Sequence, residues 1–372
     1  MPADRCLSLQ ESYAAKALAI LQSGVSSANK SNALGQAMGT PPPDFIGDQE
    51  FSKRTNDRLR SRVPAADLGV LTDCRKLSRS ALRLAQAGSF SESQKTLTVA
   101  QRMAEQIQAA ETRLVFDSLW FAAVAYLSYK MGNCGDANQK LCSSMFCDGQ
   151  LENQFDYALF HLHRIHLVAN AIKIEVKRND LTAACVIAGD LLAYLAGTSS
   201  SLNFPGSWGW QHLSLPAGNF RVNFATATGE LAHLLAAVET QTARKLFALS
   251  TGFMTGQLTA NHVDDTAMIW FRAKKHALDG EVEEFLVQAQ KLLATAPYYL
   301  NAKLWCATAF DVLSLCDSRD TEITEPLRGV LQYFGKWSFM TDGVKGFLSK
   351  RYVQLGILSQ TASSVRPGEP VN

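Results

Sequence analysis

The residues best suited to chemistry in this chain of 372 residues are histidines and cysteines in its first half. Imidazole nitrogens and thiolates bind Zn²⁺ where four of them converge. His163 and His166 of the motif FHLHRIH share a helical face, but His161 does not. No CxxC or HxxxH spacing occurs, so we expect buried thiols and ordinary histidines, with no metal and no cofactor. The metal ligands to consider otherwise are Cys142, Cys147, His163 and His166.

An acidic pair, Asp264 and Asp265, offers a second type of chemistry. Two adjacent carboxylates can bind Mg²⁺, but the third carboxylate of such a cluster is missing, because Met268 stands in its place. Asp and Asn before a helix accept hydrogen bonds from its first amides and complement its positive end. We therefore predict that Asn261, Asp264 and Asp265 cap a helix.

One basic cluster stands out, although the formal net charge of the chain is only +2. No aromatic residue lies among its members to stack on a base. The sequence therefore favours a solvated start of a helix over a contact with nucleic acid. The cluster consists of Lys53, Arg54, Arg58, Arg60 and Arg62.

Motifs of known enzyme classes are missing from the sequence. It contains no Gly-rich phosphate loop, no G-x-S-x-G elbow and no nucleotide-binding GxGxxG. We predict no catalytic residue and favour a protein without catalytic activity, while an enzyme remains the alternative.

Residues 198–220 differ in composition from the rest of the chain. Prolines and glycines prevent a helix here, yet the segment is too aromatic for a simple solvated loop. It either packs its tryptophans between helix pairs or presents them as anchors for a partner, because tryptophan buries much surface at little entropic cost. The candidate binding residues are Phe204, Trp208, Trp210, His212 and Phe220.

The elements around this segment are predicted to be helices. Apolar residues recur at helical spacing from Lys53 to Ser359, and strand signals are nearly absent. A further short amphipathic helix is predicted over 11–22. Short polar breaks separate the helices, and Ser89 with Glu92 forms a capping box after the first of them. The predicted turn centres are Gly88, Gly132, Asn179, Glu239, Gly280 and Ser318.

The turns recur at about 40–47 residues, the length of two long helices and a turn. The third interval is longer by about 15 residues, and the aromatic segment accounts for the excess. A single pair cannot cover its own apolar face, so neighbouring pairs must stack.

Within these units the pattern resembles tetratricopeptide repeats. Gly132 stands at the inner turn, with Ala125, Ala137 and Ser144 where two helices cross closely. The stretch from Trp270 to Pro297 matches in the same way, and Phe285 replaces the alanine of the motif. The resemblance covers about residues 70–318. It implies an all-α, right-handed solenoid of about six antiparallel helix pairs and a groove that binds a peptide or protein; the alternative fold is an irregular helical bundle.

These observations predict five parts of the chain. Eight scattered cysteines, no run of eighteen apolar residues and no secretory signal favour a cytoplasmic protein without a membrane partner. The predicted parts are a short helix with a Pro/Ser/Gly linker (1–50), N-terminal repeats (51–197), the aromatic insertion (198–220), C-terminal repeats (221–359) and a disordered tail (360–372).

The function that follows is a non-enzymatic adaptor, regulator or chaperone-like scaffold. Its partner would be another protein or peptide, and self-association is possible. The alternative is an enzyme or small-ligand sensor with a pocket beneath residues 198–220.

Overall fold

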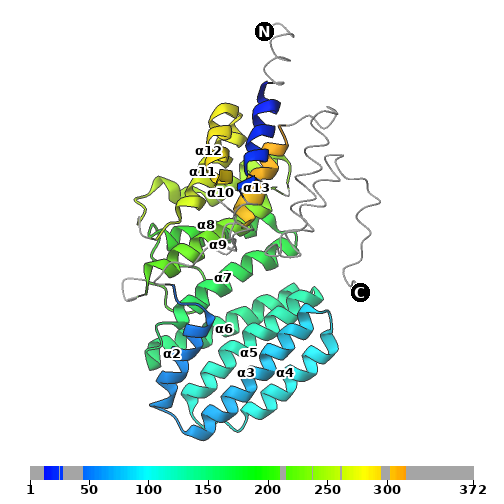
Figure 1. Cartoon of the computed structure of the whole chain (residues 1–372). Helices are drawn as coiled ribbons and strands as arrows, with labels where there is room; N and C mark the ends of the chain where they lie inside the picture. The colour runs from blue at the N-terminus through cyan, green and yellow to red at the C-terminus, as the bar shows by residue number, and fades with distance from the viewer. Residues whose placement is uncertain are drawn as a thin grey trace. The chain divides into compact units, whose positions relative to one another are not determined.

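The computed structural model describes residues 12–24, 26–27, 45–209, 215–236, 238–259, 262–294 and 302–315 (Figure 1). These residues form helices joined by turns and short loops, and no β-strand occurs among them. The predicted all-α class is therefore confirmed. None of the helices in these ranges combines the length and the apolar character needed to cross a bilayer.

The first helix, called here the N-terminal helix, includes the described residues 12–24 and 26–27. The helices that follow are α2 (Asp48–Arg60), α3 (Ala65–Gln86), α4 (Phe90–Ala104), α5 (Ala110–Met131), α6 (Cys134–Phe155), α7 (Phe160–Lys177), α8 (Leu181–Leu195), α9 (Ala217–Ala236), α10 (Thr240–Ser250), the 3₁₀ helix η2 (Gly252–Thr255), α11 (Asp265–Asp279), α12 (Val282–Ala294) and α13 (Ala302–Leu313).

The helices break where the sequence predicts turns. Gly132 and Gly280 follow α5 and α11 with φ of 87° and 81°, a left-handed conformation that glycine adopts without steric cost. Asn179, between α7 and α8, has φ of 63°, which asparagine tolerates better than most residues. The predicted turn at Ser318 lies outside the described residues.

Asp180 and Asp264 cap the helices that follow them, but the predicted capping box is wrong. Ser89 precedes α4, yet its side chain makes no capping hydrogen bond. Asp180 has a similar backbone conformation before α8, and its carboxylate, which extends one bond farther than a serine hydroxyl, accepts from the Ala183 amide at 3.0 Å. Asp264 caps α11 as predicted, accepting from the Ala267 amide at 2.9 Å, whereas Asn261 lies outside the described residues.

By contacts between Cα atoms, the chain forms two compact units, and the division passes through α9 and α10. The central unit holds α2 to α8, α9 up to Ala227 and the stretch from Ala248 to Val263. The split unit holds the N-terminal helix, the rest of α9 and α10, and α11 to α13. The predicted boundary at 198–220 does not coincide with this division.

In the central unit, consecutive helices pack against each other across their turns, α3 with α4, α5 with α6 and α7 with α8. Small residues lie where the helices approach: Ser93 of α4 donates to the Ala81 carbonyl, and Ser144 of α6 donates to the Ser118 carbonyl, both at 2.8 Å. These hydroxyl groups are buried, and each bond satisfies a group that would otherwise be costly to bury.

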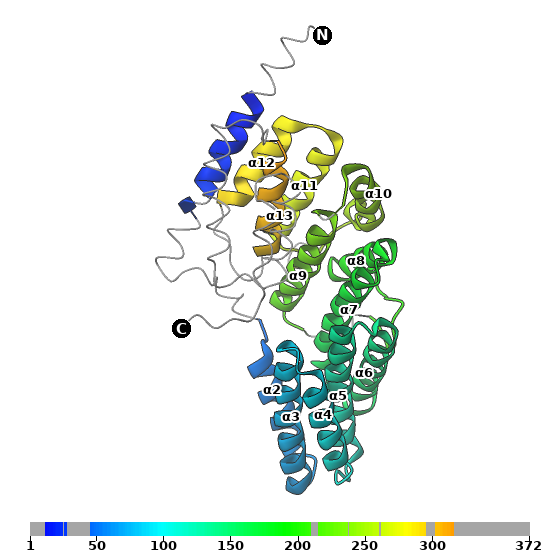
Figure 2. The same ribbon diagram turned by 90° about the vertical axis from the view of Figure 1, so that its right-hand side faces the viewer.

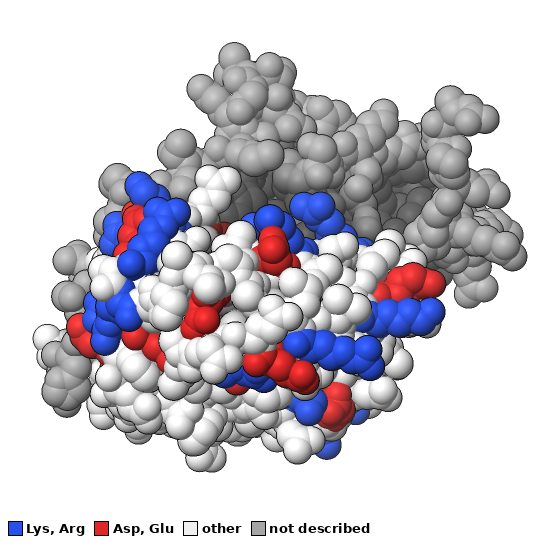
Figure 3. All heavy atoms as spheres, turned by 90° about the horizontal axis from the view of Figure 1, so that it is seen from below, with Lys and Arg blue, Asp and Glu red and all other residues white. Residues whose placement is uncertain are grey.

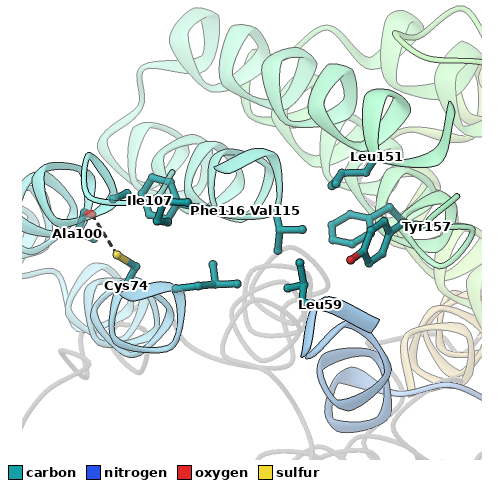
Figure 4. Packing of buried hydrophobic residues seen from close by; sticks show 11 residues of the cluster. Leu59, Cys74, Ala100, Ile107, Val115, Phe116, Leu151 and Tyr157 are labelled. Carbon is teal, nitrogen blue, oxygen red and sulfur yellow. Dashed lines mark hydrogen bonds between the residues drawn. The ribbon is translucent and has the colours of Figure 1, made fainter. Parts of the chain in front are cut away.

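A cluster of buried side chains from α2 to α7 forms the core of the central unit (Figure 4). Leu59 of α2 and Tyr157 before α7 lie at one side, and Cys74 of α3 donates through Sγ to the Ala100 carbonyl at 3.3 Å at the other. Burying this apolar surface supplies the main driving force for packing the helices together.

The split unit joins segments that are far apart in the sequence. The N-terminal helix lies beside α12 and α13, as both ribbon views show (Figures 1 and 2), and Ser27 donates to the carbonyl of Ala294, 267 residues away, at 3.0 Å. Trp270, Phe271 and Trp305 are buried in this unit. The short helix predicted over 11–22 is confirmed for the described residues from 12 onward, but its place against α12 and α13 was not predicted.

Candidate functional site

A buried guanidinium organises the described half of the aromatic segment. Arg164 of α7 is fully buried, and it forms two parallel hydrogen bonds with Glu152 of α6, from Nε to Oε1 at 2.8 Å and from Nη2 to Oε2 at 2.6 Å. A buried charge requires such compensation, because taking it out of water costs several kcal/mol. The side chain is thus held in one orientation, toward the residues that follow α8.

The same guanidinium fastens the loop. Nη2 of Arg164 donates to the Ser207 carbonyl at 2.7 Å, and Nη1 donates to the Pro205 carbonyl at 3.4 Å. The Trp208 ring lies over the guanidinium, with its centroid 4.4 Å from Cζ of Arg164. A planar guanidinium suits this role, since its edges donate hydrogen bonds while its face stacks on an aromatic ring. The Trp208 indole donates to the Phe204 carbonyl at 2.8 Å and so closes the loop on itself.

Two glycines let the loop approach this closely. Gly206 has φ of 101°, and a Cβ there would overlap Nη1 of Arg164. A Cβ on Gly149 of α6 would lie only 3.0 Å from the Cα of Gly206. Backbone and guanidinium therefore occupy the space beneath this half of the loop, where the ligand-sensor alternative requires a pocket.

A neutral histidine completes the cluster. Nδ1 of His161 lies 2.9 Å from Nη2 of Arg164, and Nε2 of His161 lies 2.7 Å from the Tyr194 hydroxyl. Burial lowers the pKa of His161, although Glu152 acts in the opposite direction. Burial also raises the pKa of Tyr194. The cluster thus holds a charged Arg–Glu pair beside two neutral rings.

Ser118, Asp148 and His163 bring the residue types of a hydrolase triad together, but in a different order. In a triad the serine faces Nε2 of the histidine and the aspartate faces Nδ1. Here Ser118 donates directly to Asp148. Both residues also face the same nitrogen of His163, because Nδ1 lies 2.8 Å from the Asp148 carboxylate and 3.4 Å from the Ser118 hydroxyl. Burial alone would lower the pKa of His163, but the Asp148 charge and hydrogen bond raise it. The arrangement holds α5, α6 and α7 together and does not activate a nucleophile.

The candidate binding residues of the aromatic segment are only partly placed together. Phe204 and Trp208 are half-buried in the loop on Arg164. Phe220 is buried in α9, where its ring stacks on His262 at 4.5 Å between centroids. Trp210 and His212 lie outside the described residues. Trp208 thus takes the packed arrangement of the two that the sequence left open.

The metal-ligand candidates are engaged in other interactions or separated. His163 bonds to Asp148, and burial raises the pKa of the Cys147 thiol to about 12, which disfavours the thiolate that binds metal. Cys142 and His166 are exposed on α6 and α7. Within the described ranges no three His, Cys, Asp or Glu residues gather in a way that could hold an ion.

Arginines of the predicted basic cluster pair with carboxylates. The pairs are Arg54 with Glu50 at 2.7 Å, Arg58 with Asp156 at 2.9 Å, Arg60 with Asp57 at 3.1 Å and Arg62 with Glu111 at 3.4 Å. On the face seen in Figure 3, basic and acidic side chains are interspersed rather than gathered by sign. Nucleic acid binding depends on an excess of positive charge on one surface, which this face does not present.

A second candidate site lies in the split unit. The N-terminal helix buries Ala14, Ala17 and Leu21, and Gly24 continues the same face at spacings of three and four residues. A Cβ on Gly24 would lie 3.1 Å from the Leu293 Cβ. Gly24 thus lets the helix lie close to α12 and α13, and we call the surface of these two helices that it covers the helix-binding groove.

Beside the docked helix the groove stays open. A space of about 490 Å³ lies between the N-terminal helix and α12, lined by Ile20, Leu286 and Val287 among others. Val287 is 51% exposed, and an exposed ion pair joins Lys16 to Glu283 at 3.5 Å. The N-terminal helix thus leaves part of the apolar surface of α12 uncovered.

A smaller cavity of about 140 Å³ lies between α10, α11, α12 and α13 in the same unit. Its walls include Lys274 and Asp311, whose ammonium and carboxylate lie 2.9 Å apart, together with Phe285 and Phe310. The two charges compensate each other, so the cavity presents no unpaired charge from this pair to a ligand.

Sequence reasoning missed Arg164, Glu152 and the helix-binding groove. Arg164 is the one Arg or Lys between Phe160 and Ile172, and a charge on a buried face is a usable signal for an internal ion pair. Comparison of the chain with protein-family models, curated proteins and solved structures finds no match.

Proposed function

We propose that this protein is a non-enzymatic scaffold of stacked helix pairs that binds a protein or peptide partner as a helix. The observation that supports this proposal is that α12 and α13 contact the N-terminal helix, although Ser27 and Ala294 are 267 residues apart. A surface that selects a helix by shape within the chain has the properties needed to select one from a partner, in the helix-in-groove mode of recognition.

The architecture that we propose is a right-handed, tetratricopeptide-like solenoid of antiparallel pairs. Support comes from the left-handed Gly132 at the turn and from the burial of Ala125, Ala137 and Ser144 beside it. Such arrays present extended surfaces that suit peptide segments.

We propose the cytoplasm as the location and another protein as the partner. The support is chemical: six cysteines among the described residues are unpaired, and thiols persist in a reducing compartment. The non-enzymatic role is supported by Ser118, Asp148 and His163, which bond to one another in an order that does not serve catalysis.

The test uses the full chain with Leu21→Asp, which places a charge on the buried face of its own helix and so frees the groove. A labelled peptide of residues 10–27 should then bind saturably, as measured by fluorescence anisotropy. The same peptide carrying Leu21→Asp is the matched control and should not bind. Equal binding of both peptides, or of neither, contradicts the proposal.

A further inference from the structure

We propose that the N-terminal helix is an internal occupant of the helix-binding groove, which a partner helix with the same pattern of small residues displaces. This inference rests on the proposed function and adds its regulation and the class of partner.

The buried face of the N-terminal helix is suited to exchange. Ala14 and Ala17 are buried but contribute little area, Gly24 contributes none from a side chain, and Leu21 is the one large residue among these four. Hydrophobic stabilisation scales with the apolar area removed from water. The fit is therefore close in shape at these four positions, whereas Tyr13, Leu18 and Ile20 are only half-buried, so the helix leaves part of its own apolar surface in water.

The groove also defines its partner. At Gly24 a Cβ would lie 3.1 Å from the Leu293 Cβ and 3.3 Å from Cζ2 of the Trp305 ring, so a bulky side chain at that position is excluded. A partner helix must carry small residues at the positions of Ala14, Ala17 and Gly24 and an apolar residue at that of Leu21. A basic residue at the position of Lys16 would complement Glu283.

A partner can gain contacts that the internal helix does not make. Leu286 and Val287 line the open space beside the N-terminal helix, and Val287 is half-exposed. A helix with larger apolar residues on its flank would cover them. This difference in contacts supplies the preference that displacement requires, because a ligand shifts an equilibrium only by its differential affinity.

Covalent linkage makes the internal helix a strong competitor. The segment 28–44 joins it to the rest of the chain, and a tethered ligand acts at an effective concentration in the millimolar range. We therefore expect the internal helix to reduce the apparent affinity for a free helix at least about tenfold.

The experiment measures the affinity of the labelled 10–27 peptide for four full-length proteins. Leu21→Asp and Gly24→Leu each weaken the internal helix and leave the groove intact, and Gly24→Leu serves if the charged variant does not fold by circular dichroism. Gln22→Asp places the same charge on the exposed side of the helix. We expect the first two variants to bind at least about tenfold more tightly than the wild type and Gln22→Asp.

Two other outcomes distinguish failure of this inference from failure of the proposed function. The same affinity for all four proteins overturns the internal-occupant inference and leaves the groove as a binding site. No binding to any of them overturns the proposed function, and the inference fails with it.

Discussion

At Arg164 one guanidinium serves three segments of the central unit, because it pairs with Glu152 of α6, projects from α7 and fastens the loop after α8. Removing one partner of a buried pair leaves the other charge without compensation, at a cost of about 3–5 kcal/mol. We expect Arg164→Met to lower the free energy of unfolding of the central unit by this amount, measured by urea denaturation.

The matched control is Arg54→Met on α2, whose ion pair with Glu50 is exposed, and which should leave the stability unchanged. Combining Arg164→Met with Glu152→Gln should recover part of the loss, since no carboxylate is then left unpaired. A loss from Arg164→Met no larger than that of the control contradicts the structural role of the pair.

As the pH falls, two histidines of α7 should change the free energy of unfolding in opposite directions. The pKa of His161 is lowered in the folded chain, chiefly by burial, so the unfolded chain binds more protons and stability falls as the pH drops through about 6.5. The pKa of His163 is raised, so protonation adds stability as the pH falls from the folded pKa toward about 6.5.

Between about pH 7.5 and about pH 5.5, His161→Gln should therefore lose less stability than the wild type, and His163→Gln should lose more. Urea denaturation at both pH values gives the comparison, and other histidines contribute equally to all three proteins. Shifts of the same sign in both variants would contradict the assigned protonation states.

At the scale of elements, the close approach of α6 and the loop can be tested at Gly149. A Cβ there would meet the Cα of Gly206 at 3.0 Å, and a backbone atom cannot move aside without displacing the loop. We expect Gly149→Ala to cost about 1–3 kcal/mol of stability and to change the near-ultraviolet circular dichroism of Trp208.

The control for this substitution is Gly69→Ala in α3, where a Cβ meets nothing within 4 Å. Alanine there should raise stability by about 0.5–1 kcal/mol, because it restricts the unfolded chain. A gain from both substitutions would show that the loop does not rest on α6 as described.

Helix caps give a second test at this scale. Asp264 accepts from the Ala267 amide, so Asp264→Ala should cost about 1 kcal/mol in thermal or urea unfolding. Ser89 makes no such bond, and Ser89→Ala should have little effect. A larger loss at Ser89 than at Asp264 would contradict both assignments.

The success of sequence reasoning follows the range of the interactions involved. The turns at Gly132 and Gly280 depend on the conformation of one residue, and the start of α11 depends on a contact over three residues. The composition of residues 198–220 likewise predicts a loop. Arg164 as its anchor depends on a contact across 43 residues, and no local pattern specifies which buried charge meets which carbonyl.

At the scale of the whole molecule, the division into two units predicts which helices a substitution in the N-terminal helix destabilises. Because the N-terminal helix belongs to the split unit, Leu21→Asp should expose the amides of α12 and α13 and raise their hydrogen exchange by about tenfold or more. Exchange in α5 and α6 should stay as in the wild type.

Mass spectrometry of deuterated peptides gives this measurement, with Gln22→Asp as the matched control. Faster exchange across both units would show that the N-terminal helix stabilises the whole molecule rather than one part.

The separation of Ser27 and Ala294 by 267 residues has a consequence for synthesis on the ribosome. At about 5–20 residues per second, the N-terminal helix leaves the ribosome roughly 13–50 seconds before α12 and α13 exist to cover it. Its apolar face is available to chaperones during that time. Folding of the split unit must therefore wait until α12 and α13 have been translated, whereas α2 to α8 can complete their packing earlier.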